Sequence, residues 1–68
     1  MSDPNVTLSD HDIIKAAYQD AVEKIFAVFL DSVVAAKNDQ TQIDAAKQRF
    51  KAAVAPTRTA RDTALSLL

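Results

Sequence analysis

Hydrophobic residues recur at intervals of three and four positions along two long segments of the chain. The first segment runs from Ile14 to Ala36, and the second runs from Ile43 to Leu68. Because an α-helix turns once in about 3.6 residues, this spacing gathers the apolar side chains on one face of a helix. The pattern therefore predicts an all-α protein built from two helices.

Each predicted helix carries one continuous stripe of mostly apolar residues. The first stripe consists of Ile14, Tyr18, Ala21, Val22, Ile25, Phe29, Ser32, Val33 and Ala36. The second stripe consists of Ile43, Ala46, Phe50, Ala53, Val54, Thr57, Arg61, Ala64, Leu65 and Leu68. A broad stripe of this kind is typical of a helix that packs against a neighbour along one side.

Polar residues mark both ends of the first helix. Ser9 is followed three positions later by Asp12, a pattern that resembles a capping box with Asp in the usual place of Glu or Gln. At the other end, Asn38 is a residue that tolerates the left-handed conformation in which many helices end. These signals predict a helix over residues 9–37, preceded by a flexible lead-in over residues 1–8.

The second helix contains a proline. Thr41 and Asp44 repeat the capping pattern, which predicts a helix over residues 41–67. Pro56 lacks a backbone N–H and clashes with the preceding turn, yet the stripe keeps its phase on both sides. The sequence therefore favours one continuous helix with a kink at Pro56, and a short third helix capped by Thr57 is the alternative.

A short connection between long helices makes them antiparallel neighbours, so residues 9–68 are predicted to form one helical hairpin domain. The predicted partners across the hairpin are Phe29 with Phe50, Ile25 with Val54, Val22 with Thr57, Tyr18 with Arg61, and Ile14 with Leu65.

The two halves of the chain differ in charge. Residues 1–40 carry seven acidic and three basic side chains, whereas residues 41–68 carry two acidic and five basic ones. The hairpin brings the halves together, which predicts that Asp31 pairs with Lys47 and Asp20 with Arg58. The asymmetry would then be neutralised within one chain.

A hairpin of this size has few means of stabilising itself. The chain has 68 residues and no cysteine, and below about 70–80 residues one core rarely suffices without disulfides, metals or association. The first helix extends its apolar surface beyond the stripe through Phe26, Leu30, Val33 and Val34. Because a helix that is apolar almost all round is buried on several sides, these residues are the predicted interface of a homo-oligomer or with another protein. A homodimeric four-helix bundle is the simplest such assembly.

The sequence indicates no catalytic residues, metal site or cofactor. His11 is the single histidine, and its acidic neighbours Asp10 and Asp12 point about 100° away on a helix and do not converge on one ion. Without Gly the chain has no glycine-rich phosphate loop, and without Cys it has no thiol nucleophile. We therefore expect a protein that is not an enzyme.

Two clusters on the second helix suggest alternatives. Lys47, Lys51 and Arg58 line one edge and are placed to contact phosphates, so a small RNA- or DNA-binding regulator is the alternative function. Arg61 lies within the apolar stripe opposite Tyr18. There the guanidinium is expected to stack on the ring, and the alternative is a small polar pocket for a ligand.

The sequence predicts neither a secretory signal nor a membrane span. The N-terminus has no basic start followed by an apolar core, and the apolar run from Ile25 to Ala36 is interrupted by Asp31 and too short to cross a bilayer. These features favour a cytoplasmic protein. The predicted function is a non-enzymatic interaction or assembly module that acts as a homo-oligomeric helical bundle.

Overall fold

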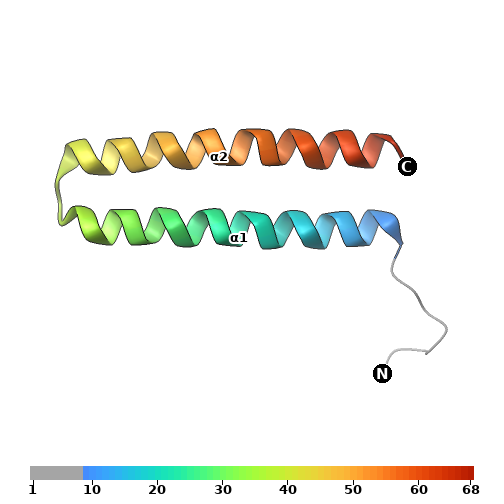
Figure 1. The fold of residues 1–68 in the computed structure, drawn as a ribbon, viewed down its shortest axis with the longest axis horizontal. Helices are drawn as coiled ribbons and strands as arrows, with labels where there is room; N and C mark the ends of the chain where they lie inside the picture. The colour runs from blue at the N-terminus through green and yellow to red at the C-terminus, as the bar shows by residue number, and fades with distance from the viewer. Residues whose placement is uncertain (1–8) are drawn as a thin grey trace, which may run out of the picture.

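The protein is a hairpin of two antiparallel helices of equal length (Figure 1). The structure, a computed structural model, describes residues 9–68, so the predicted lead-in over residues 1–8 lies outside the described part. Helix α1 spans Asp10–Ala36 and helix α2 spans Gln40–Ser66, with 27 residues each. The predicted all-α hairpin is confirmed, and each helix boundary lies within one residue of the predicted position.

Helix α1 begins and ends where its capping residues predict. The Asp12 backbone N–H donates to Ser9 Oγ at 3.2 Å, which satisfies one of the free donors of the first turn. After Ala36 the chain reverses through Lys37 and Asn38, whose φ angles are 48° and 69°. The sequence indicated Asn38 for this conformation. Lys37 also adopts it, because a chain without glycine has to make a left-handed turn from other residues.

The start of α2 differs from the prediction that Thr41 is its cap. The N-cap is Asp39, whose carboxylate accepts from the backbone N–H groups of Thr41 at 3.0 Å and Gln42 at 3.3 Å. Asp39 is the better cap in this turn because one carboxylate oxygen accepts two of the free N–H groups and carries negative charge to the positive end of the helix dipole.

Helix α2 continues without interruption through Pro56. Thr57 does not start a third helix: its hydroxyl donates to the carbonyl oxygen of Ala53 at 2.8 Å, one turn earlier. The predicted continuity of the helix is therefore confirmed. The kink at Pro56 stays a prediction.

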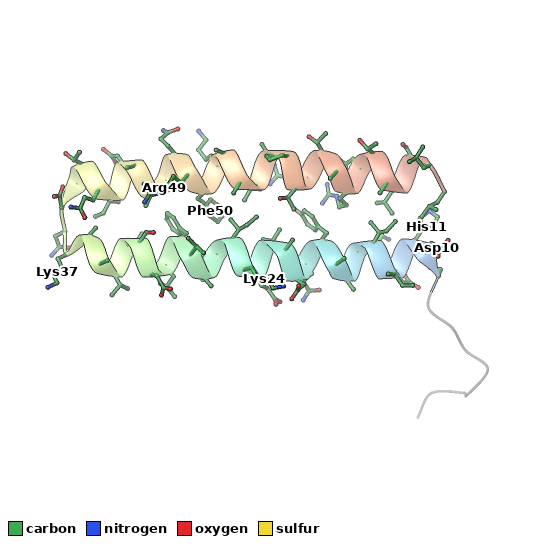
Figure 2. All side chains as sticks on the ribbon, in the orientation of Figure 1. Asp10, His11, Lys24, Lys37, Arg49 and Phe50 are labelled. Carbon is green, nitrogen blue, oxygen red and sulfur yellow. The ribbon has the colours of Figure 1, made fainter. Side chains whose placement is uncertain are left out.

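Two aromatic contacts establish the register of the hairpin. The rings of Phe29 and Phe50 pack with centroids 5.0 Å apart, and Phe50 points into the space between the helices (Figure 2). The Arg61 guanidinium carbon lies 4.4 Å from the centroid of the Tyr18 ring. Both are predicted pairs. Eleven residues separate Tyr18 from Phe29 in α1, and eleven residues separate Phe50 from Arg61 in α2. The predicted alignment of the two helices is therefore confirmed.

The side chains that face the other helix recur every eleven residues. One such series is Ile14, Ile25 and Ala36 in α1, and its counterpart is Ile43, Val54 and Leu65 in α2, all of them buried or half-buried. An eleven-residue spacing averages about 3.67 residues per turn, close to that of a straight helix. The two helices can therefore stay in contact along their length without a left-handed supercoil.

The core of the hairpin is very small. Among the described residues, only Ala36, Ala46 and Val54 are buried, with 4%, 2% and 9% of their surface exposed. The Cα atoms extend only 8 Å along the shortest axis of the molecule, so the helices form a single layer. Two of the three buried side chains are methyl groups, which bury little apolar surface each.

The predicted ion pairs between the helices do not form. Asp20 pairs with Lys24 within α1 at 2.9 Å, and Lys47 pairs with Asp44 within α2 at 3.9 Å. Within residues 9–68 no ion pair joins α1 to α2. The sequence prediction was wrong because it matched height along the hairpin and ignored direction: Asp20 and Asp31 lie on the outer side of α1, away from α2. Figure 2 shows Lys24 on the side of α1 that is turned away from α2.

Removing the Asp39 cap is expected to destabilise the protein. Asp39→Ala leaves two backbone N–H groups of α2 without their acceptor and should lower the free energy of unfolding by about 1 kcal/mol, within a range of about 0.5–2. Urea unfolding followed by circular dichroism is the measurement. Thr41→Ala is the matched control and should have little effect; a larger loss for Thr41→Ala than for Asp39→Ala would restore Thr41 as the cap.

Replacing Pro56 is expected to stabilise the protein. Pro56→Ala supplies a donor for the Ala52 carbonyl and removes the clash of the ring, which together should raise the free energy of unfolding by about 1–3 kcal/mol. Thermal unfolding at one fixed protein concentration is the measurement. Thr59→Ala, an exposed change on the same helix, controls for helix propensity, and a gain for Pro56→Ala no greater than for this control would contradict the prediction.

Candidate interaction surface

The single-layer hairpin has two broad faces that no other part of residues 9–68 covers. Side chains two positions apart on a helix point about 160° apart. Val28 and Phe26 therefore lie on opposite faces of the hairpin. We call the face that carries Val28 the groove face and the one that carries Phe26 the patch face.

The groove face is hollowed along the seam between the helices. A depression of about 240 Å³ at its centre is lined by Ile25, Val28, Phe29, Ser32, Ala46, Arg49, Phe50 and Ala53. Further depressions continue it towards the turn, beside Ala35 and Ala45, and towards the open end, beside Ala17 and Ala60. Small side chains on both helices produce this groove because they leave the space above the seam unfilled.

Sequence reasoning missed the groove face as an apolar surface. Val28 is 65% exposed there, although it is a large apolar side chain. A signal for it is present in the sequence: Ile14 and Ala21, at one edge of the main stripe of α1, are followed at the same seven-residue spacing by Val28 and Ala35. Because Val28 is the only one of the four that is both large and exposed, the series contributes little to a search for large exposed side chains.

The patch face carries the predicted interface residues. Phe26 is 51% exposed and Leu30 is 47% exposed, while Val33 is half-buried. Val34, at 68% exposed, lies farther round at the outer edge of α1. The Phe26 ring packs against the ring of Phe29, with ring centroids 6.5 Å apart. The four residues thus form one continuous surface.

The predicted basic edge borders the same face on α2. Lys47, Lys51 and Arg58 are all exposed. Lys51 and Arg58 rim a depression of about 270 Å³ that is otherwise lined by Phe50, Val54 and Ala55. The patch face therefore combines an apolar surface on α1 with a cationic rim around an apolar floor on α2.

Tyr18 and Arg61 meet at the open end of the hairpin. The guanidinium lies over the ring, and Arg61 Nε donates to the carboxylate of Asp62 at 2.8 Å. This hydrogen bond, together with the charge of Asp62, holds the pKa of Arg61 above its usual value. The charge that the sequence places within the stripe is thus partnered by a ring and a carboxylate. A ligand pocket at this point stays a prediction.

The remaining titratable groups form only local pairs. The hydrogen bond and the charge of Asp20 raise the pKa of Lys24. Asp10 and His11 lie at the open end of the hairpin (Figure 2). In the described part of the chain, no three His, Cys, Asp or Glu side chains are grouped so that they could hold a metal ion.

Comparison of the chain with protein-family models, with curated proteins and with solved structures finds no match. Neither described helix is both long and apolar enough to cross a membrane. The two open faces of the hairpin are thus the features from which its function has to be inferred.

The contact between Tyr18 and Arg61 is expected to be energetically coupled. Tyr18→Ala and Arg61→Ala should each lower the free energy of unfolding, and the double variant should lose about 0.5–1 kcal/mol less than the sum of the two. Urea unfolding of the four proteins is the measurement. Tyr18→Phe keeps the ring and should retain most of the coupling, whereas strict additivity would show that stacking does not stabilise the fold.

Proposed function

We propose that this protein is a non-enzymatic assembly module whose hairpins associate with one another into a helical bundle, most simply a homodimer of four helices. The observation that carries the proposal is the exposure of Phe26 and Leu30 on a hairpin with only three buried side chains in its described part. Contiguous exposed apolar surface on a small protein marks an interaction site, and this hairpin needs additional burial to be stable.

The burial available on the patch face is sufficient to matter. Fully burying a large apolar side chain contributes about 1.5–3 kcal/mol. Phe26 and Leu30 are each about half exposed, so a symmetric contact that covers both in two copies gains on the order of 3–6 kcal/mol. Domain stabilities are about 5–15 kcal/mol in total. Association through this face would therefore supply a large part of the stability of the fold.

A second copy suits this surface better than a lipid surface does. Helices that lie on membranes usually carry Lys and Arg on the polar side. In α1 the polar side carries Asp20 and Asp31 instead. Anionic headgroups would repel these carboxylates, whereas a protein with basic residues would attract them.

Nucleic-acid binding is the second candidate function, and the geometry of the basic edge favours it. Lys51 and Arg58 are exposed and form no ion pair with any residue of the described chain. Two or three phosphate contacts give weak, salt-sensitive binding without sequence preference. The edge offers no aromatic side chain positioned for base stacking, because Phe50 lies between the helices, so assembly remains the preferred function.

Placing a charge in the patch is expected to dissociate the assembly. Leu30→Glu should yield a monomer that is largely unfolded, because the charge opposes burial and the isolated hairpin has too little core. Val34→Glu should act in the same direction more weakly, since Val34 lies at the outer edge. Sedimentation equilibrium and circular dichroism over a dilution series are the measurements, because an obligate oligomer loses mass and helicity together.

Gln48→Glu is the matched control for this experiment. It adds the same charge at nearly the same height along the hairpin, on the exposed outer side of α2. The control protein should associate like the wild type. A wild-type protein that stays a folded monomer at micromolar concentration would contradict the assembly function. Salt-dependent binding of a mixed DNA or RNA oligonucleotide by that monomer, lost in Lys51→Gln, would then support the second candidate.

A further inference from the structure

We infer that two hairpins stack patch face on patch face, with α1 of each copy lying on α2 of the other and the two-fold axis running parallel to the helices. This inference rests on the proposed self-assembly and specifies which surfaces meet. It follows from the register of the hairpin, from the depression on α2 and from the distribution of charge.

The register decides which residues come together. A two-fold axis parallel to the helices leaves every residue at its own height along the hairpin. The contacts of Phe29 with Phe50 and of Tyr18 with Arg61 fix these heights. By the same register Phe26 is level with Ala53, so it comes to lie over the centre of the depression between Lys51 and Arg58 of the second copy.

The chemistry of the depression suits an aromatic ring beside a carboxylate. Its floor is apolar, and its rim carries the two cations of Lys51 and Arg58. A cation over the face of an aromatic ring is attracted by the quadrupole of the ring. One turn before Phe26, Glu23 is exposed on the same side of α1 and would come beside Arg58. The Glu23 and Phe26 side chains thus present the two groups that the depression recognises.

The net charges of the helices favour placing α1 of one copy on α2 of the other. Helix α1 carries five acidic and two basic residues, and α2 carries two acidic and five basic ones. The described hairpin does not neutralise them internally, because its ion pairs all lie within one helix. Stacking α1 on α2 twice brings opposite charges together, and charge complementarity of this kind selects the partner and its orientation.

The other ways of stacking are less favourable. A two-fold axis perpendicular to the helices would set α1 on α1; with the axis at the middle of the hairpin, Glu23 would face Glu23 and Phe26 would be level with Asp20. The basic edge would face itself. Stacking through the groove face would cover Val28, but its central depression offers no carboxylate to pair with Arg49, and Phe26 and Leu30 would stay exposed.

Reversing the charge on each side of the contact tests the arrangement. Glu23→Lys and Arg58→Glu should each weaken self-association several-fold, because each homodimer then contains two repulsive contacts. A mixture of the two variants should form heterodimers more tightly than either variant self-associates, because both contacts become attractive again. Sedimentation velocity on the separate and mixed proteins is the measurement. Asp31→Lys makes the same change of charge on α1 but away from the patch face. When it is mixed with R58E, heterodimers should not be favoured over homodimers.

Disulfide formation distinguishes the possible arrangements, because the chain has no cysteine of its own. Val33→Cys mixed with Lys47→Cys should cross-link, since these positions lie on the patch face at adjacent heights. Glu23→Cys alone should not cross-link, and neither should Val28→Cys mixed with Ala53→Cys on the groove face. Two results would overturn the arrangement but leave self-assembly intact. One is efficient cross-linking of Glu23→Cys alone or of the groove-face mixture. The other is a dimeric protein in which the mixture of Val33→Cys and Lys47→Cys does not cross-link. A monomeric wild type would instead remove the proposed function itself.

Discussion

The seam between α1 and α2 buries few side chains completely, and the rest of the molecule depends on this. Ala36 and Ala46 are its most buried residues, and Phe29 with Phe50 is its only aromatic pair in the described chain that spans the two helices. Small residues let the helices approach closely, yet they remove little apolar surface from water. The seam therefore fixes the register of the hairpin precisely enough to align the helices without supplying the burial that a domain of this size needs. In the proposed assembly, that burial comes from the patch face.

Much of the fold could be predicted from the sequence because its signals are periodic and local. The spacing of Ile14 to Ala36 and of Ile43 to Leu68 predicted both helices, and the short connection predicted the pairs Phe29 with Phe50 and Tyr18 with Arg61. The phase of the stripe across Pro56 predicted an uninterrupted α2. Each of these depends only on the geometry of a helix and on the length of a turn, which a sequence specifies directly.

The features that the sequence did not reveal arise from competition between nearby groups. Asp39 and Thr41 are both capable caps, and only the backbone of the turn decides that Asp39 reaches two N–H groups. Asp20 has a basic residue one turn away in Lys24, so the local pair forms where a pair across the hairpin was expected. The groove face was missed because its depth depends on the space that the neighbouring helix leaves open. Composition and spacing do not decide between such alternatives, because the outcome depends on where the groups lie in three dimensions.

The straightness of the seam explains why the charge asymmetry has consequences outside a single chain. With contacts repeating every eleven residues, a spacing close to that of a straight helix, the helices need only slight coiling to stay in contact, so each broad face keeps nearly the same side chains facing outwards along its length. In a strongly supercoiled pair, the acidic side of α1 and the basic edge of α2 would rotate towards and away from one another along the molecule. Here they stay apart, with the carboxylates on the outer and patch sides of α1 and with Lys47, Lys51 and Arg58 along one flank of α2. In the proposed arrangement, a second copy turned over neutralises this flat hairpin, because that operation places the acidic helix of each copy on the basic helix of the other.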